Sequence, residues 1–123
     1  LEKSEERKNL FKELNKQQES VIEIPCIIGG KEFYTGNTTD IVLPHNHKKI
    51  IGRFHNVTEK ELDLAVKAAI DAQKIWSELS WTVRASILLK AAELISGKYR
   101  HTINAATMLG QSKNIFQSEI DGV

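Results

Sequence analysis

The sequence predicts an α+β fold in which an N-terminal helix precedes two β-hairpins and a run of helices. Three observations support this fold class. Several stretches carry helix caps and apolar residues at helical spacing, short apolar runs are paired around turn residues, and the strand-like runs precede the main helices. The length of 123 residues, with 41% hydrophobic and 27% charged residues, suits one globular unit.

The first predicted element is a helix from Ser4 to about Gln18. Ser4 can cap it, and the acidic residues of its first turn have the sign that the helix dipole favours. Its apolar stripe is narrow and consists of Leu10, Phe11 and Leu14. Because such a helix is marginal alone, we expect it to depend on contacts with other parts of the protein.

Two β-hairpins are predicted next. The first spans residues 26–35 around the turn Gly29-Gly30, and the second spans residues 40–54 around a polar turn over 44–48. An isolated hairpin is marginal in water. We therefore expect a sheet, a helix or another part of the protein to cover both hairpins.

Four helical stretches follow, counted from Glu59. Thr58 and Glu61 form a capping-box pattern, after which apolar residues recur at helical spacing as far as Leu79. A second amphipathic stretch runs to Ile95 and is closed by Gly97, where a left-handed residue costs little.

The third predicted helix runs from Tyr99 to Leu109 and is ended by Gly110. The fourth begins near Ile115 and is cut short by the end of the chain. We therefore expect the natural domain to continue past Val123.

Charge and composition argue against several functional classes. The formal net charge is +1, and the densest basic stretch contains only Lys48, Lys49 and Arg53, which argues against nucleic-acid binding. No apolar run approaches the ~20 residues of a membrane span. The chain begins at Leu1, not Met, so we expect an upstream segment to be missing.

The sequence offers few candidates for chemistry. Cys26, the single cysteine, follows a proline in an apolar strand, which favours structural burial over a reactive role. His45 and His47 could share a strand face, but a zinc site needs further ligands, so surface histidines are the preferred interpretation. Trp76 and Trp81 are predicted to be core or staple residues and not a stacking platform.

Six stretches, in this order, resemble the N-terminal region of a known enzyme family: Ile24–Gly30, Leu43–His47, Ala72–Trp76, Arg84–Ala85 with Leu89–Gly97, Thr107–Lys113 and Gln117–Asp121. The family is the aldehyde dehydrogenases. The Gly-Gln-Ser-Lys and Glu-Ile-Asp segments resemble the branch that oxidises glutamate semialdehyde, the open form of pyrroline-5-carboxylate. The likeness covers roughly residues 24–123 and does not rest on one short pattern.

The resemblance implies a complete enzyme of α/β architecture, with a Rossmann-like NAD-binding domain, a catalytic domain and an oligomerisation flap. In that family a cysteine thiolate attacks the aldehyde, hydride passes to NAD, and a glutamate activates water. The motifs for these residues lie beyond the point that corresponds to Val123. We therefore expect no catalytic, cofactor-binding or metal-binding residue in this chain, and no activity of the chain alone.

The resemblance also implies a division of the chain into two parts and a subcellular location. Residues 1–22 would be an N-terminal helix with its connection, and residues 23–123 an incomplete N-terminal part of the aldehyde dehydrogenase fold. The complete enzyme would act on a small-molecule aldehyde as a homo-oligomer, without nucleic-acid or membrane partners. It would reside in the mitochondrial matrix in a eukaryote and otherwise in the cytoplasm.

Glu119 is the one candidate site residue. The resemblance implies that its helix lines the substrate tunnel of this branch. The residue type alone predicts an exposed helix acid that faces solvent or forms an ion pair.

Three functional hypotheses follow. The first is a segment of an NAD-dependent oxidoreductase that converts L-glutamate γ-semialdehyde to L-glutamate in proline catabolism. The second is a non-catalytic truncated or spliced form that acts as a binding module. The third is a free-standing α+β binding module whose likeness to the family is coincidental. The coding sequence past Val123 would separate the first two.

Overall fold

A computed structural model describes residues 4–123, and within them the chain forms five helices and five strands. The helices are α1 (Glu5–Glu19), α2 (Glu59–Glu78), α3 (Trp81–Ser96), α4 (Arg100–Gln111) and α5 (Ile115–Gly122). The strands are β1 (Ile22–Ile24), β2 (Cys26–Ile28), β3 (Lys31–Phe33), β4 (Thr38–Leu43) and β5 (Asn46–His55). This element content confirms the predicted α+β class.

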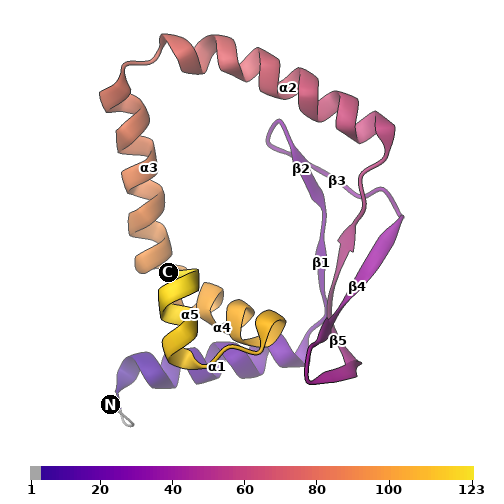
Figure 1. Ribbon diagram of the computed structural model, residues 1–123, viewed down its shortest axis with the longest axis vertical. Coiled ribbons are helices and arrows are strands. Elements are labelled where there is room, and N and C mark those ends of the chain that lie inside the picture. The colour runs from indigo at the N-terminus through magenta and orange to yellow at the C-terminus, as the bar shows by residue number, and fades with distance from the viewer. Residues whose placement is uncertain (1–3) are drawn as a thin grey trace.

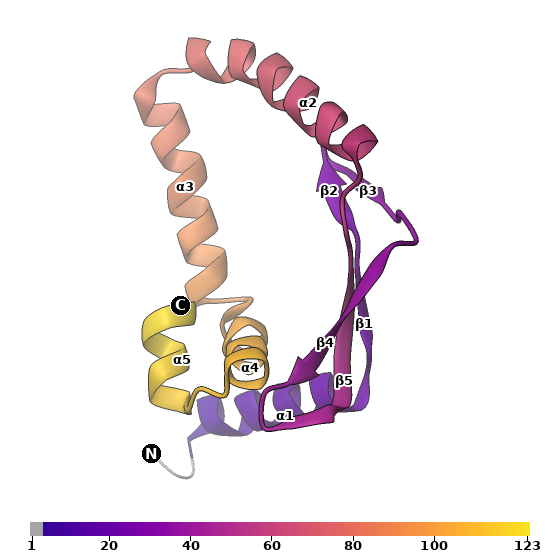
Figure 2. The ribbon, with the colours of Figure 1, turned by 45° about the vertical axis from the view of Figure 1, so that its right-hand side comes forward.

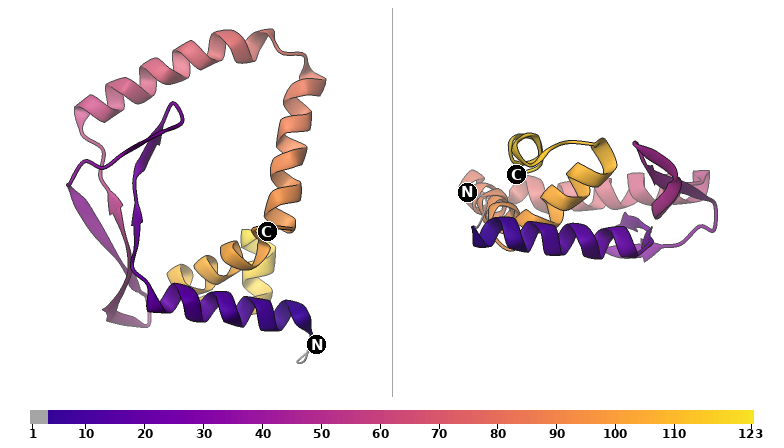
Figure 3. Two further views of the ribbon diagram at one scale, coloured as in Figure 1. Left: turned by 180° about the vertical axis from the view of Figure 1, so that it is seen from behind. Right: turned by 90° about the horizontal axis from the view of Figure 1, so that it is seen from below.

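The elements are arranged as an open frame and not as stacked layers (Figure 1). Helix α1 forms the base, the strands rise along one side, α2 crosses the far end, and α3 returns toward α4 and α5. The turned view shows the same arrangement, with α4 lying over α1 (Figure 2). Seen from behind, α2 and α3 are single helices without a second layer (Figure 3).

The core lies at the base of this frame, where α1, α4 and the connected ends of β4 and β5 meet. Its buried apolar residues are Leu10, Leu14, Leu43, Ala105 and Leu109. The Gln17 side-chain amide also donates to the backbone oxygen of Thr102, at 3.0 Å. The expectation that the N-terminal helix depends on the rest of the protein is thereby confirmed.

The strands form a three-stranded sheet of order β1-β5-β4 and a separate β2–β3 hairpin. The hairpin turn was predicted correctly: Gly29 and Gly30 both have positive φ, of 56° and 76°, which glycine adopts without strain. Strand β1 was not predicted. It pairs in parallel with β5, and a three-residue strand before a proline has too little pattern to be recognised.

Two predicted boundaries and one predicted backbone conformation were wrong. The second hairpin turn occupies only Pro44 and His45, because the polar residues that follow pair as part of β5. Gly110 lies inside α4, and the left-handed residue after the helix is Ser112, with φ of 53°. Gly97 does cap α3, but at φ −110°; an added Cβ there would lie 2.9 Å from the Glu93 backbone oxygen.

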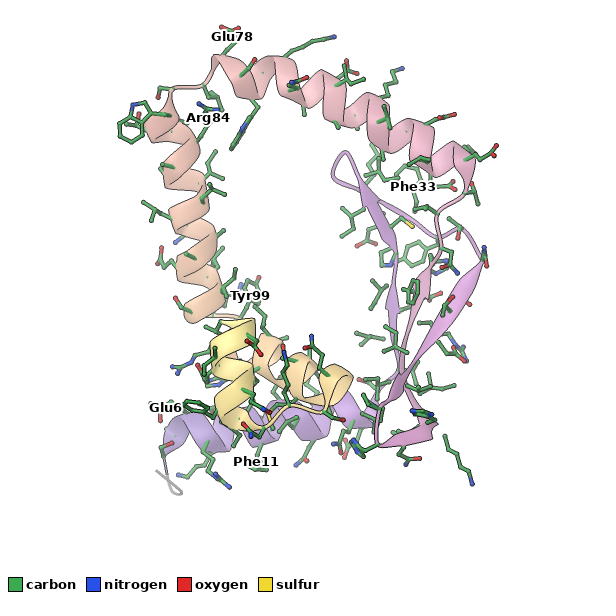
Figure 4. The ribbon with its side chains drawn as sticks, in the orientation of Figure 1. Glu6, Phe11, Phe33, Glu78, Arg84 and Tyr99 are labelled. Atoms are coloured by element: carbon green, nitrogen blue, oxygen red, sulfur yellow. The ribbon has the colours of Figure 1, made fainter. Side chains whose placement is uncertain are left out.

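The predicted strip of apolar residues on α2 and α3 exists but is not covered. Within the described residues, neither helix buries a hydrophobic side chain, and large apolar residues stand in solvent along both. Trp76 is 39% exposed and Trp81 is 73% exposed, so the prediction that they are core or staple residues was wrong for this chain. Figure 4 shows side chains extending freely around the corner between Glu78 and Arg84.

The predicted capping box at the start of α2 is present. The Glu61 carboxylate accepts hydrogen bonds from the Thr58 hydroxyl and, at 3.1 Å, from the Thr58 backbone N–H. The hydroxyl bond is the main cause that holds the pKa of Glu61 below its ordinary value. Because the folded-state pKa is lowered, this contribution to stability exists above the unfolded-state pKa and is lost as pH falls through the folded-state value.

We expect Glu61→Gln to lower the stability of the protein at pH 7 by more than it does at low pH. Glutamine still accepts a hydrogen bond but has no charge to place near the helix N-terminus. Chemical denaturation of parent and variant over pH 3–7 measures the difference. A difference that stays constant over that range would contradict the assigned role of the charge.

Candidate functional site

The candidate site lies where α5 folds back onto α4. The left-handed residue Ser112 reverses the chain, and Asn114 then caps α5 by accepting from the Gln117 backbone N–H at 2.9 Å. Ser118 is fully buried in this contact, and its hydroxyl donates to the Ile115 backbone oxygen. These local features bring α5 close enough for its acidic side chain at position 119 to reach α4.

Glu119 is held by two residues of α4. The Arg100 Nε atom lies 3.0 and 3.2 Å from the two carboxylate oxygens, and its Nη2 atom lies 3.1 Å from Oε2. The Asn104 Nδ2 atom donates to Oε1 at 2.7 Å. The carboxylate therefore accepts from both an arginine fork and a side-chain amide, a geometry that fixes direction as well as distance.

This cluster is only partly covered. The side chains of Arg100 and Glu119 are 39% and 33% exposed, whereas Asn104 is fully buried. Of the two ion-pair partners, neither is isolated from solvent, so the pair itself contributes modestly to stability. Asn104 is the buried anchor of the cluster.

Asn104 has one unusual feature. Its Oδ1 atom is buried without a hydrogen-bond partner, although its Nδ2 atom is satisfied by Glu119. An unsatisfied buried acceptor costs about 1–3 kcal/mol. Of the two polar atoms of the Asn104 amide, only Nδ2 has a hydrogen-bond partner, and that partner is Glu119.

A small cavity of about 140 Å³ borders Glu119. Its wall is formed by α1, α4 and α5, with Glu6, Arg7 and His101 among the lining residues. The pKa of Glu6 is lowered, chiefly by a hydrogen bond from its own backbone N–H and then by one from Ser4, with smaller contributions from the charges of Arg100 and His101. Charges of both signs thus gather at the start of α1 beside the cluster.

A larger cavity of about 410 Å³ lies between α1, α4 and the sheet. Isoleucines of β1, β4 and β5 line it together with Leu109, and the polar side chains Glu13, Lys16 and Gln17 border it. Ser20 and Thr102 are also among the lining residues, so apolar and polar residues share the wall of this cavity.

The other predicted candidates do not converge on Glu119. Cys26 is half-buried in β2, where its thiol donates to the His55 backbone oxygen at 3.1 Å. His45 lies in the β4–β5 turn, and His47 lies in β5 and not in the turn as predicted. Across residues 4–123, no group of three or more His, Cys, Asp or Glu side chains is placed to hold a metal ion.

His55 is a structural histidine. Its side chain is 3% exposed, its Nδ1 accepts from the Gly36 backbone N–H at 3.1 Å, and its Nε2 lies 2.9 Å from a Glu23 carboxylate oxygen. Because Nδ1 accepts, the ring proton belongs on Nε2, which donates to Glu23. His55 therefore ties β5 to β1 and to the loop before β4.

Arg100 and Asn104 were not among the predicted site residues. Their spacing of four places them on one face of α4, which was visible in the sequence. Nothing in the sequence indicated that this face meets Glu119. Helix packing alone creates the cluster.

None of the described helices is long and apolar enough to cross a membrane. This observation concerns residues 4–123 only.

Comparison with known proteins gives a consistent result. Residues 33–122 match the family model described as "Aldehyde dehydrogenase family". A probable delta-1-pyrroline-5-carboxylate dehydrogenase of Schizosaccharomyces pombe is 45% identical over 111 residues, which are 90% of this chain and 20% of the relative. The mitochondrial delta-1-pyrroline-5-carboxylate dehydrogenase of Homo sapiens is 38% identical over 96% of this chain and 21% of its own length.

Solved structures agree with these relatives. The delta-pyrroline-5-carboxylate dehydrogenase of Mycobacterium tuberculosis, bound with NAD, is similar with a TM-score of 0.95 and 41% identity. This chain is covered completely, and the solved chain to 23%. The Thermus thermophilus 1-pyrroline-5-carboxylate dehydrogenase has a TM-score of 0.89 and 25% identity, over 97% of this chain and 23% of its own. The chain thus spans about a fifth of the length of these proteins.

Proposed function

Since this chain belongs to the aldehyde dehydrogenase family, we propose that it is the N-terminal segment of an NAD-dependent enzyme that oxidises L-glutamate γ-semialdehyde to L-glutamate. The observation that supports this most directly is the 41% identity to the Mycobacterium tuberculosis enzyme along the whole chain, with a TM-score of 0.95. Relatives with the same named activity match 90–96% of the chain.

In this proposal the segment is a scaffold and does not supply the reacting groups. We assign residues 1–22, of which 1–3 lie outside the described residues, to the N-terminal helix and its connection, and residues 23–123 to the beginning of the aldehyde dehydrogenase fold. The single thiol lies in β2 and donates to the His55 backbone oxygen, so it is not a free nucleophile. The chemistry therefore belongs to later parts of the complete enzyme.

NAD does not fit the residues of this segment. A dinucleotide is held by a glycine turn that leads from a strand into a helix N-terminus. The strand-to-helix connection in the described residues joins β5 to α2 through Asn56, Val57 and Thr58, without a glycine. NAD is the cofactor of the proposed complete enzyme, and this segment does not hold it.

The uncovered faces of α2 and α3 support the same proposal. An amphipathic helix obtains most of its stability by burying its apolar face. Here that face is exposed on two successive helices, as expected for a segment whose covering layer belongs to the remaining four-fifths of the enzyme. The alternative of a non-catalytic binding form would cover the same faces with a partner chain.

We further propose that Glu119 lines the substrate passage of the complete enzyme. One-third of its side chain remains exposed, and its carboxylate borders a cavity while being held from behind by α4. The enzyme would act as a homo-oligomer on a small aldehyde. It would reside in mitochondria in a eukaryote, as the names of the relatives from Dictyostelium discoideum and Homo sapiens state for those proteins.

The test compares the complete coding sequence with residues 1–123. We expect the complete protein to reduce NAD with glutamate semialdehyde, and the isolated segment neither to do so nor to bind NAD in a calorimetric titration. A coding sequence that stops at Val123 would favour the non-catalytic form. Saturable NAD binding by the segment at micromolar concentration would contradict the scaffold role.

A further inference from the structure

We propose that Arg100 and Asn104 are positioning residues for Glu119, and that through it they allow the complete enzyme to prefer a charged aldehyde over an uncharged one. This inference rests on the proposed function and on the tunnel-lining role of Glu119. It assigns both residues a role through Glu119 and not through direct contact with the substrate.

The contacts to Glu119 restrict the orientation of its carboxylate. A glutamate side chain has three rotatable bonds, so an unrestrained carboxylate at a half-exposed position samples many orientations. Arg100 restrains both carboxylate oxygens through contacts of 3.0–3.2 Å, and Asn104 restrains Oε1 through a further contact of 2.7 Å. The carboxylate is therefore held at one place on the surface of α5.

The Asn104 side chain is fixed by its burial between α4 and α5. Asn104 is fully buried, so its amide cannot move without disturbing the contact between α4 and α5. A Cβ added at Gly122 would lie 2.9 Å from the Thr107 Oγ1 atom of α4, so a side chain at that position would force the two helices to shift. Glycine at position 122 thus permits the close approach of α5 that brings Glu119 within reach.

Helix α4 is itself held in place by α1. Leu10 and Leu14 of α1 are buried together with Ala105 and Leu109 of α4. The general family model begins at residue 33, after α1, whereas the named pyrroline-carboxylate relatives match 90–96% of the chain. The helix that supports α4 thus lies outside the part of the chain that matches the general family model.

A fixed carboxylate matters to specificity because glutamate semialdehyde has an ammonium and a carboxylate group, whereas a simple alkyl aldehyde has neither. A charged substrate is oriented by charges at fixed positions, and small displacements of such groups reduce turnover strongly. An uncharged aldehyde makes no such contact. Loosening Glu119 should therefore affect the charged substrate selectively.

The experiment measures kcat and KM of the complete enzyme for glutamate semialdehyde and for propionaldehyde. Arg100→Met removes three of the four contacts to the carboxylate. We expect the ratio of kcat/KM for the charged to the uncharged substrate to fall about tenfold. Arg100→Lys keeps the charge but not the fork, and should recover part of the ratio.

Two controls separate positioning from structural damage. Arg53→Met removes an arginine from another exposed ion pair, with Asp40 at 2.7 Å, and should leave the ratio unchanged. In a Glu119→Gln background, Arg100→Met should change the ratio by less than twofold, because the group that it positions has lost its charge. A merely structural role of Arg100 would lower the ratio equally in both backgrounds, or not at all.

Two results would show that Arg100 does not position Glu119. An unchanged ratio in Arg100→Met overturns the inference, as does an equal change in the Glu119→Gln background. If Arg100→Met does not fold, the comparison of Arg100→Lys in the two backgrounds replaces it. If the parent enzyme reduces NAD with propionaldehyde but not with glutamate semialdehyde, the proposed substrate is wrong. That result contradicts the proposed function and not the positioning of Glu119 by Arg100.

Discussion

The isolated 123-residue chain should self-associate in solution, and charged substitutions on α3 should suppress this. Leu88 and Leu89 are 67% and 71% exposed, and Ile75 and Trp81 are each 73% exposed. Large apolar side chains exposed along successive helices promote association when nothing covers them. Light scattering after gel filtration, over a range of concentrations, measures the effect for the parent chain and for Leu88→Glu with Leu89→Lys.

The same pair of substitutions should have the opposite effect in the complete enzyme. If the remaining chain covers α3, the two charges become buried without partners and lower the melting temperature. The control uses two exposed residues of α1. Lys8→Glu with Lys12→Glu should change little either in the self-association of the isolated chain or in the melting temperature of the complete enzyme. If the isolated chain is a monodisperse monomer and binds no hydrophobic dye, the apolar faces of α2 and α3 do not require a covering layer.

Asn104→Asp should destabilise the complete enzyme severely, by about 3–5 kcal/mol at neutral pH. The substitution replaces a fully buried donor with a carboxylate next to Glu119, whose Oε1 atom lies 2.7 Å from the present Nδ2 atom. Two carboxylates at that distance cannot both ionise without large cost. The melting temperature relative to the parent enzyme measures the loss.

The pH dependence of this variant has a definite sign. The new carboxyl group would have a folded-state pKa raised by its neighbour and by burial, so its protonation favours the folded state. The difference from the parent should shrink as pH falls. Asn9→Asp, on an exposed position of α1, is the matched control and should stay within about 0.5 kcal/mol. Equal melting temperatures for Asn104→Asp and the parent would contradict the burial of this cluster.

The helices were largely predictable because their signals are local. Caps, acidic first turns and apolar spacing lie within a few residues of each other, and they indicated α1, α2 and α3 nearly to their ends. The glycine turn between β2 and β3 was predictable for the same reason. The second hairpin turn was misplaced because β5 pairs with β4 from Asn46 onward. The end of α4 was misplaced because the helix continues through Gly110 to Gln111.

By itself the sequence determined the helices, the strands other than β1, their order and, through six ordered stretches, the family to which the chain belongs. It also determined that α2 and α3 have apolar faces, but not that these faces stay uncovered within this chain. Only the tertiary structure decided that Glu119 meets Arg100 and Asn104, which lie 19 and 15 residues away. The physical reason is that helix formation depends on neighbours in sequence, whereas the rotation and approach of α5 on α4 depend on packing between faces that no local pattern specifies.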